Sequence, residues 1–348
     1  MVAVVAALSL IAGVVAAPLA PRQSDAAETA RAAKIVGPDS GLNDCASCHA
    51  LEVEAWQNTA HYSDFAERHR SPGAAAVLGA LGLRTMKRGA TCRRCHYTST
   101  IQDGQVTPKW GVSCESCHGP AADWVGVHSH ARGDVNANVL PIGAGKTEAP
   151  DARRARLAAA AAKGFIHSQM LYEIAVTCLG CHIVADEDLV NRGGHVPGSA
   201  FDLVAWSQGQ VRHNYVSSPG APSAPTNRAA TPKELRRLYV TGAMVDYELS
   251  LRAFAGATAQ GESFYSAMTD RFAAARKKVD VILATVPIAE LTAVVATLPA
   301  IPSDGASAAR AADRLRAATR AFLAKHDGAD LAKLDPLIPT VYKGRPLR

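Results

Sequence analysis

The sequence predicts a mostly α-helical protein with extensive coil, in which a cysteine-bearing N-terminal domain is followed by a C-terminal helical bundle. Alternating strand patterns are scarce along the 348 residues, while turn residues are frequent. Past residue 232, apolar residues instead recur at helical spacing between prolines and glycines. Only 5% of the residues are aromatic. Because this is few for a core of such size, we expect another large apolar group to complete the N-terminal core.

The first residues predict an export signal. Val2 to Ala17 is a nearly continuous apolar run, followed by Pro18 and a polar, alanine-rich stretch. This run of 16 residues is shorter than the roughly 20 that a membrane-spanning helix needs. We therefore expect a signal peptide over residues 1–26, with Ala26 as a cleavage position, and contact with a membrane only if this segment is retained.

All eight cysteines fall in four copies of one pentapeptide, C-x-x-C-H. The copies are Cys45-Ala46-Ser47-Cys48-His49, Cys92-Arg93-Arg94-Cys95-His96, Cys114-Glu115-Ser116-Cys117-His118 and Cys178-Leu179-Gly180-Cys181-His182. This pattern is the attachment signature of haem c. Its two thiols can form thioethers with both vinyl groups of one haem, and the histidine that follows binds the iron. The sequence thus predicts four haem c groups, numbered here in motif order, with iron ligands His49, His96, His118 and His182.

Other uses of paired cysteines explain this pattern less well. Zinc coordination does not require a histidine directly after each second cysteine. Disulfides in an exported protein would not repeat one pentapeptide, and a thioredoxin motif would occur once in a βαβ setting. Thioether attachment of haem is an extracytoplasmic chemistry, so a periplasmic location agrees with the export signal.

The pattern along the chain divides it into a haem domain over residues 27–216, a linker over 217–232 rich in proline, serine and alanine, and a helical bundle over 233–348. Within the haem domain we expect a helix from Ala50 to Arg68 that carries His61, and another from Asp151 to Lys163. Bundle helices are expected over Lys233–Ala257, Glu262–Val286, Ile288–Thr297 and Ala306–His326, separated by Pro287, Pro299 and Gly305.

Two stretches around the motifs resemble a known family. Asp44 to His61 reads DCASCHALEVEAWQNTAH, and Gly111 to His128 reads GVSCESCHGPAADWVGVH. Both look like the tetrahaem cytochrome c-554 family, known as electron acceptors of hydroxylamine oxidation in ammonia-oxidising bacteria. The resemblance runs from about Leu42 to Tyr215 and does not reach the bundle.

The resemblance implies iron ligands on the far side of three haems. In the family, the histidine that matches His61 crosses to the third haem, and the one that matches His128 crosses to the first, with His130 as the near rival here. The fourth haem's ligand lies after the fourth motif, where His213 is favoured and His195 is the alternative.

The second haem has no assigned sixth ligand. In the family its iron is five-coordinate, but His167 or His69 could fill that position here, and Met86 is a weaker candidate. Of these three residues, His167 is the predicted ligand. His326, beside Asp327, is expected to have no part in iron binding.

The function that these observations predict is electron transfer, with redox partner proteins as donor and acceptor. The alternative is a redox enzyme that acts on a small nitrogen compound at an open second haem. No motif departs from C-x-x-C-H, as catalytic haems often do, so an enzyme is the less favoured reading. The formal charge of +6 comes with no basic cluster interleaved with aromatic residues, so nucleic acid is not an expected partner.

Overall fold

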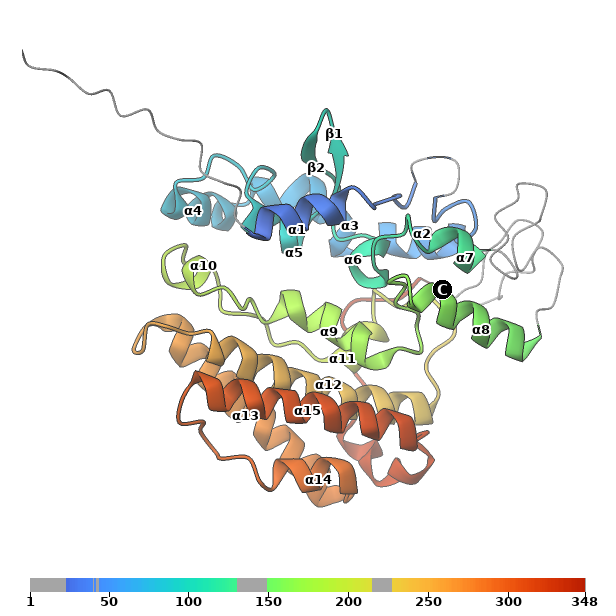
Figure 1. Cartoon of the computed structure of the whole chain (residues 1–348), viewed down its shortest axis with the longest axis vertical. Coiled ribbons are helices and arrows are strands. Elements are labelled where there is room, and N and C mark those ends of the chain that lie inside the picture. Colours follow the sequence, from blue (N-terminus) through green and yellow to red (C-terminus); the bar gives the residue numbers. More distant parts are fainter. Residues whose placement is uncertain (1–22, 40, 42–43, 130–148, 215–226, 348) are drawn as a thin grey trace, which may run out of the picture.

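The computed structural model describes residues 23–39, 41, 44–129, 149–214 and 227–347. The expected signal peptide up to residue 22, His130 and residues 217–226 of the expected linker lie outside these ranges. The chain forms three layers in Figure 1. Short helices and a hairpin of the N-terminal half form the first layer, α8 to α11 lie in the middle, and the long C-terminal helices form the third. The predicted class, mostly helical with much coil, is confirmed.

The first layer holds short helices joined by coil. They are α1 (Gln23–Ala32), α2 (Ala50–Gln57), α3 (Ala60–Glu67), the 3-10 turn η1 (Arg68–Arg70), α4 (Pro72–Leu81), α5 (Ala90–His96), α6 (Cys114–His118) and α7 (Val125–Ser129). The single helix expected from residue 50 to 68 is instead α2 followed by α3. Thr59 between them is extended (φ −104°, ψ 159°), and its hydroxyl accepts a hydrogen bond from the N–H of Tyr62. Threonine in this role begins a new helix, which explains the break.

A β-hairpin in this layer was not predicted. Strands β1 (Thr98–Gln102) and β2 (Gln105–Trp110) pair antiparallel. Asp103 (φ 48°) and Gly104 (φ 72°) form the turn, and Asp-Gly is a pair that tolerates two positive φ angles in a two-residue turn. This local signal was present in the sequence.

The middle and third layers follow the sequence pattern closely. The middle layer has α8 (Pro150–Ala161), α9 (Leu171–His182), α10 (Glu187–Asn191) and α11 (Leu203–Ser207). The third has α12 (Pro232–Ala255), α13 (Ser263–Thr285), α14 (Ala289–Val295), α15 (Gly305–Lys325) and the 3-10 segment η3 (Ala329–Leu337). The helix expected from Asp151 and the four expected bundle helices are all present. Thr231 and Glu234 form a capping box at the start of α12, which fixes where that helix begins.

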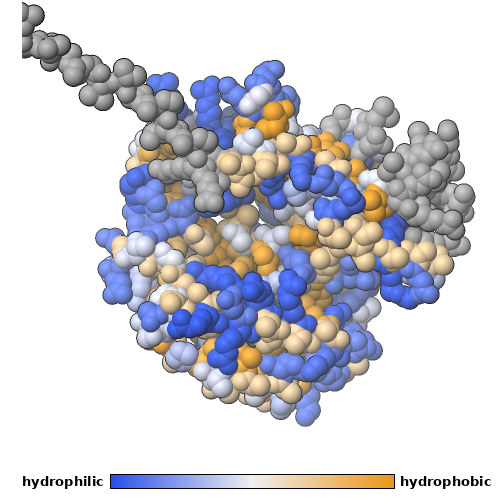
Figure 2. Space-filling view, in the orientation of Figure 1, coloured by the Kyte–Doolittle hydropathy of each residue, from blue (hydrophilic) through white to orange (hydrophobic). Residues whose placement is uncertain are grey.

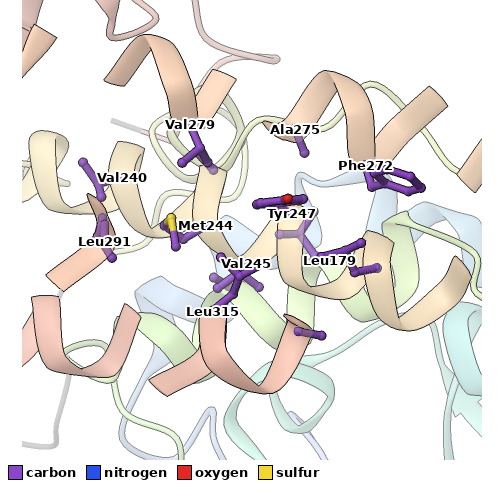
Figure 3. Packing of buried hydrophobic residues seen from close by; sticks show 14 of the residues in the cluster. Leu179, Val240, Met244, Val245, Tyr247, Phe272, Ala275, Val279, Leu291 and Leu315 are labelled. Carbon is purple, nitrogen blue, oxygen red and sulfur yellow. The ribbon is translucent and has the colours of Figure 1, made fainter. Parts of the chain in front are cut away.

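The main hydrophobic core lies among the C-terminal helices. Figure 3 shows Tyr247 and Met244 of α12 among side chains of α13, α14 and α15. Leu179 of α9, inside the fourth motif, is 1% exposed in the same cluster. The core therefore continues across the expected linker and includes the helix that carries the fourth motif.

The first layer has far less apolar packing of its own. One small cluster consists of Leu78, Met86, Cys92 and Tyr97. A second, in which Ala121 and Trp124 pack with Ala160 of α8 and Phe165, is shared with the middle layer. Figure 2 shows apolar residues along the hollow between this layer and the bundle, while hydrophilic residues cover much of the bundle's outer face. Among the described residues no helix is long and apolar enough to cross a membrane.

Candidate functional site

Each C-x-x-C-H motif lies at one end of a helix. The second, third and fourth motifs close α5, α6 and α9, while His49 of the first immediately precedes α2. A helical turn brings residues three apart to one side, so the two thiols of a motif face the same space. All eight cysteines are free of disulfides.

The motifs lie close to one another in three different pairs. Hydrogen bonding between neighbouring thiols raises the pKa of Cys45, which lies beside Cys114, and of Cys181, which lies beside Cys95. In the third pair, α6, which is the third motif, packs against α9, which ends with the fourth motif. The motifs therefore follow one another in space in the order first, third, fourth, second.

The two variable residues of the second motif are ion-paired to other parts of the chain. Arg93 makes two hydrogen bonds of 2.6 Å to the carboxylate of Glu28 in α1. Arg94 pairs with Asp186, which precedes α10, at 3.1 Å. Asp186 also accepts from the N–H of Leu189 and so caps α10. These pairs fix the second motif between the first and middle layers.

The third motif is held through a buried carboxylate. Glu115 is 1% exposed and accepts hydrogen bonds from the backbone N–H groups of Val36, Gly37 and Ala121 at 3.0, 2.8 and 2.7 Å. Burial raises the pKa of Glu115, while these hydrogen bonds oppose the rise. The carboxylate thus satisfies loop groups that have no secondary structure to bond them.

Every ring contact between two histidines among the described residues joins one motif histidine to one histidine outside the motifs. The ring centres are 5.9 Å apart for His49 and His128, 6.4 Å for His96 and His195, 6.1 Å for His118 and His213, and 6.3 Å for His182 and His61. Each motif thus has a second imidazole opposite its own.

This spacing suits two imidazoles on opposite sides of one iron. With metal–nitrogen bonds of about 2 Å, as for imidazole on other transition metals, the ring centres lie roughly 6 Å apart. Burial lowers the pKa of His96, His118 and His182 to about 4 and that of His128 to about 3, and it also lowers the pKa of His61. These rings are therefore neutral at pH 7, which is the form that binds a metal.

The hydrogen bonds of three of these histidines leave the other ring nitrogen free to bind a metal. The Nδ1 atoms of His118, His195 and His213 lie 2.7, 2.8 and 2.6 Å from the backbone carbonyl oxygens of Ile166, Val196 and Val211. A carbonyl oxygen only accepts, so Nδ1 carries the proton and Nε2 keeps its lone pair. Metal-binding histidines commonly have this arrangement.

The thiols and imidazoles at each motif fit an iron that is already held by a porphyrin ring. Among the described residues no three His, Cys, Asp or Glu side chains are grouped to hold a bare metal ion. The two thiols of each motif would hold a porphyrin through thioethers, and the two imidazoles would bind its iron. Several buried polar atoms beside these histidines, including Tyr97 Oη, Trp124 Nε1 and Trp206 Nε1, also have no hydrogen-bond partner within the described chain.

The histidines expected from the family resemblance lie in the site, but two have exchanged places. His128 lies beside His49. His61 lies beside His182 rather than beside His118, and His213 lies beside His118 rather than in the fourth site.

The backbone of His61 lies at the third motif, although its ring contacts the histidine of the fourth. A Cβ on Gly111, three residues before the third motif, would lie 1.9 Å from the backbone oxygen of His61. Trp56 Nε1 also donates to the carbonyl of Val112 at 2.8 Å. The backbone of His61 is therefore at the third motif, while its ring faces the fourth.

Among the described residues, no ring contact joins His167 or His326 to a motif histidine. The recorded ring contact of His167 is to Phe165, at 6.0 Å. Its Nδ1 accepts from the N–H of Gln169 at 3.3 Å, so its proton is on Nε2. His326 is hydrogen-bonded through Nδ1 to Asp330 and through Nε2 to Glu290, at 2.5 and 3.3 Å. His195, expected only as the alternative for the fourth site, lies in the second.

Four thioether motifs, each with its histidine opposite a second imidazole, define a haem protein of the c-type cytochrome class. Residues 44–119 match the family model described as cytochrome c554 and c-prime. A stretch of 99 residues is 31% identical to cytochrome c-554 of Nitrosomonas europaea, and it covers 26% of this chain and 42% of that protein. The chain thus matches less than half the length of this curated relative, and no solved structure matches it. The family match covers the first three motifs and confirms the resemblance in that region.

Proposed function

We propose that this protein transfers electrons through four covalently attached haem c groups and exchanges them with redox partner proteins in the periplasm. The bound iron supplies a one-electron ferric/ferrous couple. The chain supplies eight thioether sulfurs, four motif histidines and four opposing histidines, which are His128, His195, His213 and His61 for the first to fourth haem.

The observation that carries this proposal is the one-to-one pairing of the histidines. Each motif histidine faces one other imidazole at 5.9 to 6.4 Å. Where both imidazoles of a pair bound one haem iron, they would leave no position for a substrate, and the group would supply electron transfer without binding other molecules.

The contacts between motifs support transfer along a continuous row. The thiols of the first and third motifs meet, as do those of the second and fourth, and the third and fourth motifs lie on α6 and α9, which pack together. Electrons that enter at the first or second site would pass through the third and fourth. The row therefore ends at the first and second haems, which are the positions we assign to partner exchange.

The export signal and the attachment chemistry together support a periplasmic location. Residues 1–26 form the proposed signal peptide, and thioether attachment is completed outside the cytoplasm. The match to cytochrome c-554 supports the haem scaffold of the first three motifs and leaves donor, acceptor and pathway open.

Intact-mass measurement of the protein, produced with haem maturation in a periplasm, tests the proposal. We expect the mass of the processed chain plus four haems, and complete reversible reduction without substrate. Cys45→Ala with Cys48→Ala should lower the count to three, while Ser47→Ala, inside the same motif, should leave four. A mass with fewer than four haems in the unaltered chain would contradict the proposal.

A further inference from the structure

The segment that carries His195 is tied directly to the second motif. Arg94, one of its two variable residues, pairs with Asp186 at 3.1 Å. Asp186 caps α10, and His195 follows this helix by four residues. The ion pair therefore holds the start of this short helix at the second motif, and the chain reaches His195 only four residues after the helix ends.

The backbone between α10 and His195 is fixed. The N–H groups of Gly194 and His195 donate to the carbonyls of Val190 and Leu189 at 3.1 and 3.2 Å. Gly194 has φ 68°, a left-handed conformation that glycine adopts readily at a helix end. The chain is thus turned back after α10 in one defined geometry.

Gly193 allows this turn to pack on the first layer. A Cβ there would lie 2.5 Å from the carbonyl oxygen of Leu189 and 3.2 Å from the side chain of Leu81, the last residue of α4. Only a glycine gives this close approach. The loop is therefore held against the same layer that carries α5 and the second motif.

The orientation of the His195 ring is also set. Its Nδ1 donates to the carbonyl of Val196 at 2.8 Å, so the unprotonated Nε2 is available for coordination. The centres of the His195 and His96 rings lie 6.4 Å apart.

Among the described residues, neither rival histidine makes the ring contact with His96 that His195 makes. Met86 is 6% exposed and packs in the cluster with Leu78, Cys92 and Tyr97. His167 carries its proton on Nε2, because its Nδ1 accepts a hydrogen bond. For His69, on η1, no ring contact with a motif histidine is recorded among the described residues.

Resting on the proposed function, we infer that His195 is the sixth ligand of the second haem and closes that iron to small molecules. This differs from the family pattern, in which the second haem is five-coordinate. The second haem then acts as a terminus for electrons and not as a binding site for nitrogen compounds.

Electron paramagnetic resonance of the oxidised holoprotein, together with carbon monoxide binding to the reduced form, tests this inference. We expect four low-spin haems and no carbon monoxide complex. His195→Ala should convert one haem in four to high spin and make one haem bind carbon monoxide, while intact mass still shows four. Free imidazole should restore the low-spin state in that variant, which separates a lost ligand from a misfolded chain.

The matched control is His167→Ala, which should keep all four haems low-spin. A high-spin haem in the unaltered protein, or four low-spin haems in His195→Ala, would overturn the inference. If either of these results is found while intact mass still shows four haems, the inference fails but the proposed electron-transfer function does not. A lower haem count in the unaltered protein would contradict the proposed function itself.

Discussion

The haem-bearing first layer and the C-terminal bundle reach a folded state by different means. The bundle has one continuous apolar core in which Met268, Phe272, Leu315 and Phe322 are fully buried. The first layer has one cluster of four buried residues and shares a second with the middle layer, and ion pairs and single hydrogen bonds supply further links. Burial on this small scale does not offset the entropy of ordering so much coil. The comparison indicates that the bundle is stable through its sequence, while the first layer depends on its haems.

The largest expected effect tests that dependence. Replacing all eight cysteines by alanine prevents haem attachment, so we expect residues 44–129 to lose fixed structure while α12, α13 and α15 remain folded. Hydrogen exchange read by mass spectrometry should show fast exchange in the first layer and protection in the bundle. The unaltered chain produced without haem and kept reduced is the control and should behave alike. Protection of the first layer at the level of the holoprotein would break the comparison.

Removal of one large core side chain should destabilise the bundle. Phe272 is fully buried in α13 and packs on Phe254, with ring centres 5.2 Å apart. Phe272→Ala should cost about 3–5 kcal/mol in the free energy of unfolding, from lost burial and the cavity it leaves. Denaturant unfolding followed by circular dichroism measures this. Val281→Ala on the same helix, at a side chain 44% exposed, should cost no more than about 0.5 kcal/mol. Equal effects for the two variants would contradict the assigned core.

The hydrogen bond between the middle layer and the bundle should contribute less. Tyr172 of α9 donates to the buried carboxylate of Glu248 in α12, with oxygen distances of 2.9 and 3.1 Å, and Arg252 binds the same carboxylate. Tyr172→Phe should cost about 1–2 kcal/mol, because the buried carboxylate loses a donor. Tyr265→Phe, on α13 and outside this network, serves as the control. Combining Tyr172→Phe with Glu248→Gln should show non-additive unfolding free energies, and strict additivity would mean that the two groups are uncoupled.

The smallest expected effect depends on pH at the start of α12. A hydrogen bond from Arg228 is the largest cause that lowers the pKa of Glu234 to about 2, aided by Thr231 and opposed by partial burial. Since the pKa in the folded protein lies below the ordinary value of 4.5, the stabilisation is present above that value and is lost as pH falls towards 2. Both side chains of the pair are about half exposed, so solvent screening limits the effect to about 1 kcal/mol or less.

Comparison of the unaltered protein with Glu234→Gln isolates this contribution. Glutamine keeps the capping geometry at this position but carries no charge. The difference in unfolding free energy should be present at pH 6 and should vanish near pH 2. A difference that stays constant with pH would mean that the ion pair contributes nothing measurable.

Local signals predicted the bundle well. Thr231 and Pro232 mark the start of α12, and the prolines and glycine between helices mark the ends of the others, because caps and breaks depend on residues adjacent in sequence. The four motifs were equally readable, since attachment requires residues within one pentapeptide. The Asp103-Gly104 turn and the cap at Thr59 were also local signals, and these were missed.

The pairing of histidines could not be read in the same way. It depends on contacts between distant segments, such as the approach of Gly111 to the backbone of His61 and the ion pair between Arg94 and Asp186. Family resemblance placed His61 at the third motif, where its backbone does lie, but could not give the direction of the ring. The choice of His195 for the second site likewise depends on the close approach of Gly193 to Leu81.

The most direct test is a crystal structure of the holoprotein with the irons located by anomalous scattering. The account predicts four irons, each bound by one motif histidine and its partner: His49 with His128, His96 with His195, His118 with His213, and His182 with His61. An iron bound by His61 and His118 together, or a second iron without His195, would contradict the arrangement of ligands described above.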